Sequence, residues 1–170
     1  DTAIHALALM RHKGSIVWDI YGEGTLRRSL EDLASELGVS ALVRFRGYVQ
    51  DAREKIKEYD LYVQPSRFEG LSNAMIEAMQ AGCPIITSDS PGCREFVAHN
   101  TNGLTFPLGE PSALAEVLDW AVEHPLEMRE LARAARVTCL ELFDTEKIVA
   151  QWFAMLGVGL LPSDPPTPSP

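Results

Sequence analysis

Apolar residues along this chain follow two different spacings. In one set of segments they recur three and four positions apart, which is typical of amphipathic helices. This spacing predicts helices over residues 1–12, 25–37, 51–59, 71–81, 111–123, 125–142 and 144–155, with one helical turn over 94–98. In the other set they form short runs between turn residues, which predict strands over residues 15–21, 42–45, 61–64, 84–87 and 104–106.

Strands and helices therefore alternate along most of the chain, and three helices follow at the carboxyl end. Because parallel strands need helical crossovers between them, this order predicts an α/β domain with an open parallel sheet. In such sheets, ligands bind in the loops that follow the carboxyl ends of the strands. The loops to consider are 22–24, 46–49, 66–73 and 89–94.

Composition narrows the class of protein. The chain has 170 residues, 46% of them hydrophobic, which suits a globular domain. A net charge of −9 argues against a nucleic-acid groove, in which basic side chains neutralise phosphates. Three cysteines without a C-x-x-C pair argue against a disulfide framework, and no apolar run is long enough to span a bilayer. We expect a cytoplasmic protein whose residues 157–170 form a proline-rich disordered tail.

The most informative stretch follows the third predicted strand. That strand ends at Pro65, and Gly70 lets the backbone come close to a ligand. The helix that begins near Ser72 has first amides without intrahelical partners, and these carry the positive end of the helix dipole. The sequence therefore predicts an anion site here, suited to phosphate.

Two glutamates flank this predicted anion site. Glu77 lies about 7 Å further along the helix, on the face that it shares with Asn73. Its carboxylate is suited to accept hydrogen bonds from two neighbouring hydroxyls, as on a ribose. Glu69 precedes the helix and is suited to bind hydroxyls attached to the far phosphate. Glutamates often lie on a solvated helix face, but Gly70 and Asn73 favour a ribose, diphosphate and sugar bound in line.

The segment SRFEGLSNAMIEAMQAGCPII, residues 66–86, resembles the donor-binding signature of retaining glycosyltransferases with the two-domain GT-B architecture. It is most similar to their group 1, or family four, sugar-nucleotide transferases. Weaker matching pieces are residues 21–24, 45–49, 89–95 and 102–104. The resemblance implies that residues 1–156 form a Rossmann-like, nucleotide-sugar-binding domain with flanking helices.

The resemblance also implies roles at the matching positions. Glu69 would be catalytic, contacting the transferred sugar and stabilising positive charge near its anomeric carbon. Glu77 would bind the ribose of the donor. The other implied donor contacts are Gly70, Leu71, Ser72 and Asn73 near the diphosphate and sugar, Tyr48 and Val49 beside the base, and Gly22 and Gly24 along the cleft.

The implied activity is transfer of a hexosyl group from a nucleoside diphosphate sugar, a UDP-hexose, with retention, in polysaccharide biosynthesis. No metal or cofactor is implied, and the sequence has no D-x-D pair. Such enzymes hold the acceptor in an amino-terminal domain and clamp the diphosphate with an arginine and a lysine, all outside these residues. Lys13 does not replace that lysine, because it follows the first helix. We expect either part of a longer enzyme or one subunit of a split transferase, inactive alone, with membrane contact through the other half.

Two other functions stay open at this stage. A sugar-nucleotide 2-epimerase has similar architecture but depends on histidines near the cleft, and only His99 lies near a predicted cleft loop. A non-catalytic subunit that binds a nucleotide sugar is the third possibility. Arg67 and Arg94 are weaker candidates for phosphate contacts, since exposed arginines commonly bind nothing so specific.

Overall fold

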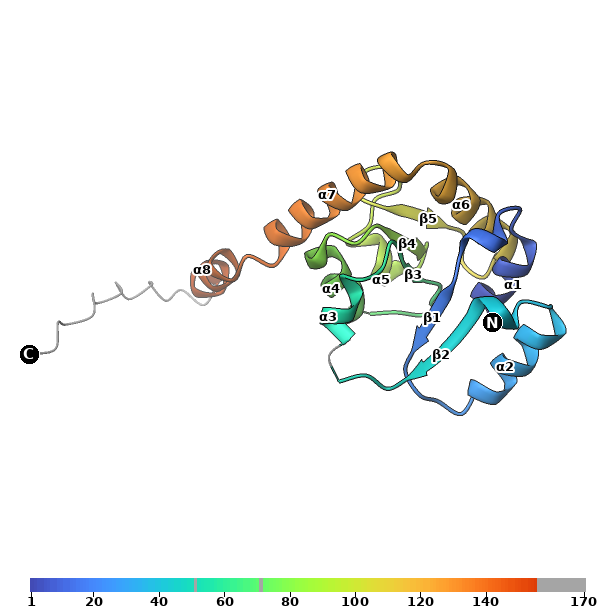
Figure 1. Cartoon of the computed structure of the whole chain (residues 1–170). Coiled ribbons are helices and arrows are strands. Elements are labelled where there is room, and N and C mark those ends of the chain that lie inside the picture. The colour runs from blue at the N-terminus through green and yellow to red at the C-terminus, as the bar shows by residue number, and fades with distance from the viewer. Residues whose placement is uncertain (51, 71, 156–170) are drawn as a thin grey trace, which may run out of the picture.

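A computed structural model describes residues 1–50, 52–70 and 72–155 (Figure 1). Leu71 and the predicted tail over residues 157–170 lie outside the described residues. The strands are β1 (Trp18–Tyr21), β2 (Val43–Gly47), β3 (Tyr62–Gln64), β4 (Ile85–Ser88) and β5 (Leu104–Phe106). The helices are α1 (Thr2–Leu9), α2 (Arg27–Glu36), α3 (Ala52–Ile56), α4 (Asn73–Ala81), α5 (Pro91–Arg94), α6 (Pro111–Glu123), α7 (Pro125–Leu142) and α8 (Thr145–Met155), with 3-10 turns at Lys13–Ser15 and Ser40–Leu42.

In the described ranges, all three pairings between strands are parallel, which confirms the predicted α/β class. However, the strands do not form one sheet. β1 pairs with β2, and β3, β4 and β5 form a second sheet in that order. Within the described residues, no strand ladder joins β1 to β3, so the parallel strands of the predicted α/β fold form two sheets. Strand periodicity predicts that a strand forms but not which edges meet.

One hydrophobic core nevertheless joins the two sheets. Ile86 and Phe106 from the second sheet and Val43 from the first belong to the same buried cluster as Ile4 of α1 and Leu118 of α6. A second cluster lies between α4, β4 and α7, and it includes Met75, Met79, Ile85, Ala135 and Cys139. The β3–α4 connection thus leads into a helix whose inner face is fully packed.

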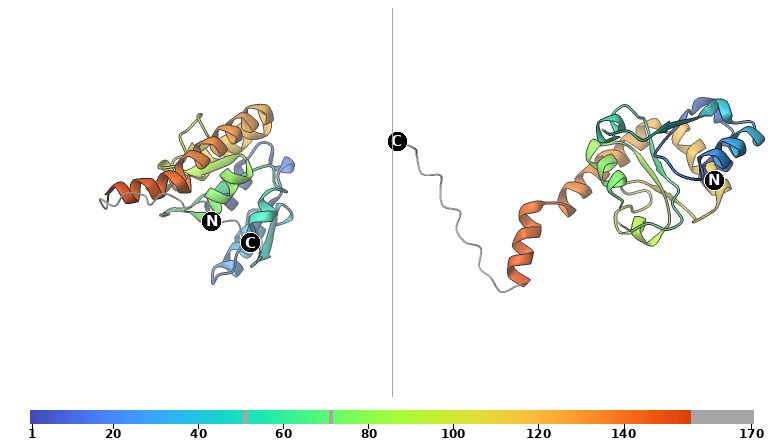
Figure 2. Two further views of the ribbon diagram at one scale, coloured as in Figure 1. Left: turned by 90° about the vertical axis from the view of Figure 1, so that its left-hand side faces the viewer. Right: turned by 90° about the horizontal axis from the view of Figure 1, so that it is seen from below.

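The carboxy-terminal helices differ in how they meet this body. α7 packs along α4, whereas α8 projects away from the rest of the molecule in Figure 1 and in the right-hand view of Figure 2. Trp152 of α8 is 62% exposed, and Met155 is 78% exposed. Among the described residues, no helix combines the length and the apolar composition that crossing a membrane requires.

Asp119 of α6 connects that helix to the loop after α1 by hydrogen bonds. Its buried carboxylate accepts hydrogen bonds from the backbone amides of Arg11 at 3.0 Å and His12 at 2.9 Å. Burial acts to raise the pKa of Asp119, but these hydrogen bonds and the charge of Arg11 outweigh it, so that the pKa lies below its usual value. The ionised carboxylate therefore stabilises the fold.

We expect Asp119→Ala to lower the free energy of unfolding by about 2 kcal/mol near neutral pH, because two backbone donors lose a charged acceptor. The folded pKa is depressed, so the wild-type advantage should be complete above the unfolded pKa of about 3.9 and disappear as pH falls through the folded pKa. Urea unfolding at a series of pH values measures this, with the exposed Glu116→Ala on the same helix as control. Equal stability of Asp119→Ala and wild type near neutral pH would show that this contact contributes nothing.

Candidate functional site

The β3–α4 loop is built around two buried polar side chains. Gln64 is the last residue of β3, and Ser72 is the N-cap of α4. The Ser72 hydroxyl accepts a hydrogen bond from the Met75 amide at 3.3 Å and donates one to Gln64 Oε1 at 2.9 Å. At the other end of α4, Gly82 stops the helix with a φ of 72°, a left-handed conformation that glycine adopts without strain. The helix therefore begins within two residues of the predicted start.

The first turn of α4 retains free amide groups. The Met75 amide is bonded to the Ser72 hydroxyl, and the Ile76 amide to the Ser72 carbonyl. Within the described part of the chain, the Asn73 and Ala74 amides have no hydrogen-bond acceptor. A side chain at the exposed Gly70 would meet nothing within 4 Å. The loop and the helix start thus leave donors and space for an anion.

The two glutamates lie near one phenol. The Glu69 carboxylate accepts a hydrogen bond from Gln64 Nε2 at 3.0 Å. Glu77, half-buried in the second turn of α4, has no hydrogen bond or ion pair with a described residue. Burial, opposed by a hydrogen bond with Ser72 and aided by the negative charges of Glu69 and Glu77, raises the pKa of Tyr62 to about 12. Both carboxylates therefore lie close enough to the Tyr62 phenol for their charges to act on it.

The loop after β4 packs against the segment that carries Glu69. The Ser88 hydroxyl donates to the Ser66 carbonyl at 2.5 Å. Gly92, in α5, lies so close that an added Cβ would be 2.2 Å from the Glu69 carbonyl oxygen and 2.3 Å from that of Gly70. The sequence indicated a loop at 89–94 but not its contact with the Glu69 segment. The close approach of Gly92 explains why this turn carries a glycine.

A second group of predicted residues follows β1 and β2. The Gly22 amide donates to the Gly47 carbonyl at 2.8 Å, and Gly22 has a φ of 121°. Gly24 is exposed, Tyr48 is 79% exposed, and Val49 is half-buried. Within the described residues, no hydrogen bond or ion pair joins this group to the β3–α4 group.

Asp19 forms a polar cluster beside this second group that sequence reasoning missed. Its Oδ2 accepts from Tyr59 at 2.6 Å and from Arg46 Nε at 2.9 Å, and Tyr21 shares a 2.5 Å hydroxyl contact with Tyr59. Burial acts to raise the pKa of Asp19, but the Tyr59 and Arg46 hydrogen bonds lower it below its usual value. The sequence does contain a signal for this cluster, because Asp19 is an aspartate inside an otherwise apolar strand.

The arginines considered for phosphate binding are paired with carboxylates. Arg67 binds Asp1 at 2.7 Å, and Arg94 binds Asp89 through two nitrogens. His99 accepts a hydrogen bond from the Thr105 amide at 3.0 Å, so its side chain stabilises β5. The part of the chain that the structure describes has no group of three or more side chains suited to hold a metal ion.

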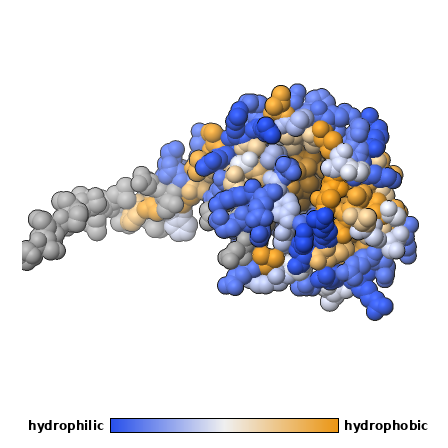
Figure 3. Space-filling view, viewed as in Figure 1, coloured by the Kyte–Doolittle hydropathy of each residue, from blue (hydrophilic) through white to orange (hydrophobic). Residues whose placement is uncertain are grey.

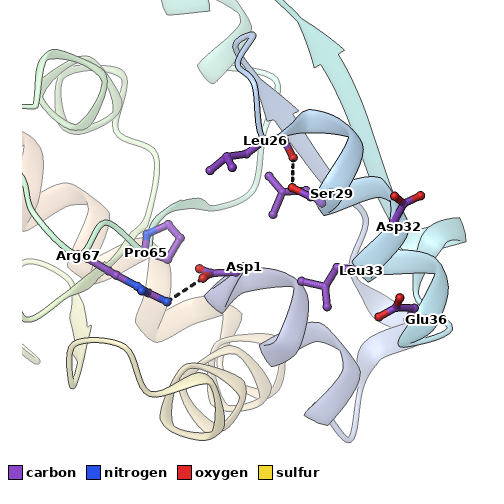
Figure 4. Close-up of a pocket in the computed structure, with 9 residues that line it drawn as sticks. Asp1, Leu26, Ser29, Asp32, Leu33, Glu36, Pro65 and Arg67 are labelled. Atoms are coloured by element: carbon purple, nitrogen blue, oxygen red, sulfur yellow. Dashed lines mark hydrogen bonds and ion pairs between the residues drawn. The ribbon is translucent and has the colours of Figure 1, made fainter.

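A hollow of about 730 Å³ lies between α2 and the start of the β3–α4 loop (Figure 4). Leu26, Leu30 and Leu33 line one side, and Asp1, Pro65 and Arg67 line the other. Figure 3 shows an apolar recess on the same face of the molecule as Figure 1. Among the described residues, none of the predicted donor contacts lines this hollow, although Arg67 lies two positions before Glu69.

The comparisons with known proteins show which protein family the chain belongs to. Residues 1–138 match the family of glycosyl transferases group 1, and the chain belongs to that family. It is 31% identical over 155 residues to the lipopolysaccharide core biosynthesis glycosyltransferase LpsE of Rhizobium meliloti, covering 91% of this chain and 45% of LpsE. It is 32% identical over 146 residues to the putative glycosyltransferase EpsD of Bacillus subtilis, covering 85% and 38%.

The fold of this chain is also found in solved structures. Anabaena Alr3699/HepE in complex with UDP superposes with a TM-score of 0.83 at 24% identity, over 92% of this chain and 44% of that one. The chain therefore has the Rossmann-like fold of a GT-B domain, and the predicted family is confirmed. It spans less than half the length of these relatives.

Proposed function

We propose that this chain is the donor-binding part of a retaining glycosyltransferase that uses a UDP-hexose. One observation carries the proposal: the start of α4 has free amides, with Glu69 in the loop before it and Glu77 in its second turn. Membership of a transferase family supports it. So do the structures of the similarly folded HepE, which were solved with UDP and with UDP-glucose.

Each part of the site has a distinct role in this proposal. The Asn73 and Ala74 amides, with Gly70 and Ser72, hold the diphosphate. As the bond to the sugar breaks, charge grows on the leaving diphosphate, and preorganised amides stabilise that charge without rearranging. Glu77 accepts from the ribose hydroxyls, and Glu69 contacts the sugar. Gly22, Gly24, Tyr48 and Val49 lie along the nucleoside side, and an acceptor domain completes the site.

A split transferase is the second candidate, and one observation favours it. The chain is 30% identical over 159 residues to the GtfA subunit of a UDP-N-acetylglucosamine–peptide N-acetylglucosaminyltransferase of Streptococcus parasanguinis, covering 89% of this chain and 31% of that protein. The exposed apolar side chains of α8 suit an additional protein surface. No comparable observation favours an epimerase. A cytoplasmic location and independence of metals and cofactors stay predictions.

Glu77→Ala should weaken UDP binding by roughly 30-fold, because the loss of hydrogen bonds from ribose hydroxyls to a carboxylate costs about 2 kcal/mol. The measurement is a titration of the ¹⁵N-labelled chain with UDP, followed through the amide signals of Asn73 and Ala74. Glu116→Ala, on α6, is the matched control and should bind as wild type does. Equal affinity of Glu77→Ala and wild type would remove the ribose role.

A further inference from the structure

We propose that Gln64 is the positioning residue of this site, fixing the Glu69 carboxylate relative to the start of α4. Its consequence for ligand binding rests on the function proposed above. Neither the sequence motif nor the comparisons assign a role to this position, which ends β3 and precedes Pro65.

Gln64 lies at the centre of a closed set of hydrogen bonds. Its side chain is buried, with only 5% of the residue exposed. Oε1 accepts from the Tyr62 hydroxyl at 2.9 Å and from the Ser72 hydroxyl at 2.9 Å. Nε2 donates to Glu69 Oε2 at 3.0 Å. These three hydrogen-bond partners come from β3 and from the loop that follows it.

This arrangement permits one orientation of the amide. The ionised Glu69 carboxylate can only accept, so the amino group must face it, and Oε1 then accepts from the two hydroxyls. A flipped amide would place its oxygen against the carboxylate and its amino group against the two hydroxyls. The orientation of Gln64 therefore fixes where Glu69 Oε2 lies and leaves the other carboxylate oxygen for a ligand.

The same side chain also reaches the helix start. Ser72 donates to Gln64 and caps α4 by accepting from the Met75 amide at 3.3 Å. One buried group thus connects the carboxylate proposed to contact the sugar with the N-cap of the helix proposed to hold the diphosphate. Because buried networks of this kind allow few alternative geometries, Gln64 sets the spacing between the two subsites.

Two variants test the hydrogen bond that Gln64 donates to Glu69, which both of them remove. Gln64→Glu keeps an oxygen for Tyr62 and Ser72 but replaces the amino group that donates to Glu69. Gln64→Met removes every hydrogen bond while filling a similar volume. We expect each variant to weaken UDP-glucose binding about tenfold while the affinity for UDP changes less than twofold. Gln151→Met on α8 is the control and should bind both ligands as wild type does.

A double-mutant cycle with Glu69→Ala distinguishes positioning from a structural role. In the Glu69→Ala background, the effect of Gln64→Glu on UDP-glucose affinity should vanish, because the carboxylate it positions is gone. If the tenfold effect persists there, or if UDP affinity falls equally, the positioning role is refuted.

The ligand-free chain gives a separate measurement. The side-chain NH₂ signals of Gln64 should move in Glu69→Ala and stay in place in Glu77→Ala, since that group donates to Glu69 and has no hydrogen bond with Glu77 among the described residues. Unmoved signals in Glu69→Ala would overturn the proposal even if UDP-glucose binds. Conversely, signals that move as expected in a chain that binds no UDP-glucose would contradict the proposed function and leave the contact itself established.

Discussion

Glu69→Gln should lower the rate of sugar transfer by a factor on the order of 100–1,000 in a complete transferase that carries this chain. The proposed carboxylate stabilises positive charge near the anomeric carbon, and a neutral amide of the same shape cannot. Losing one such electrostatic contact costs about 3–4 kcal/mol in the transition state. Because Gln64 donates to Glu69 Oε2 at 3.0 Å, the amide oxygen of the new side chain can still be held in place.

The measurement is kcat and KM for transfer from UDP-hexose, compared with the Glu116→Gln control on α6. We expect kcat to fall by a much larger factor than KM rises, since the contact is present in the ground state but strongest in the transition state. A Glu69→Gln enzyme with wild-type kcat would show that the carboxylate charge has no part in the chemistry. A rise in KM alone would assign Glu69 to ground-state binding of the sugar.

The local parts of this site could be predicted from the sequence because their causes are local. Ser72 caps α4, Gly82 ends it in a left-handed conformation, and the apolar spacing between them buries Met75 and Met79. Proline at the first position of α6 and α7 likewise placed their starts at Pro111 and Pro125, as predicted. These signals act within a few residues, so no tertiary information was needed.

The parts that were missed depend on contacts between distant segments. Nothing in the sequence shows that the parallel strands divide into two sheets, with β1 in one and β3 in the other. Gln64 in a short strand could equally face solvent, and its burial among Tyr62, Ser72 and Glu69 follows only from the path of the loop. Asp19 similarly acquires its role from Arg46 and Tyr59, 27 and 40 positions away.

Gly92→Ala should be the most disruptive single-methyl change near the site. Gly92 does not have a positive φ, so alanine introduces no backbone strain there and changes only the occupied space. The new Cβ would lie 2.2 Å and 2.3 Å from two backbone carbonyl oxygens, those of Glu69 and Gly70. Backbone atoms cannot rotate away as a flexible side chain does. Either α5 or the Glu69 loop must move, at a cost of about 3 kcal/mol.

We expect Gly92→Ala to weaken both UDP and UDP-glucose by at least tenfold, because the displaced loop carries Gly70 and leads into the first turn of α4. This separates it from Gln64→Glu, for which UDP affinity should be kept. The matched control is Gly14→Ala, where an added Cβ meets nothing within 4 Å and φ is not positive. Titration with both ligands and urea unfolding of each variant make the comparison. If Gly92→Ala binds both ligands and unfolds as wild type does, the β4–α5 loop can move aside at no cost. Gly92 would then not hold the Glu69 segment in place.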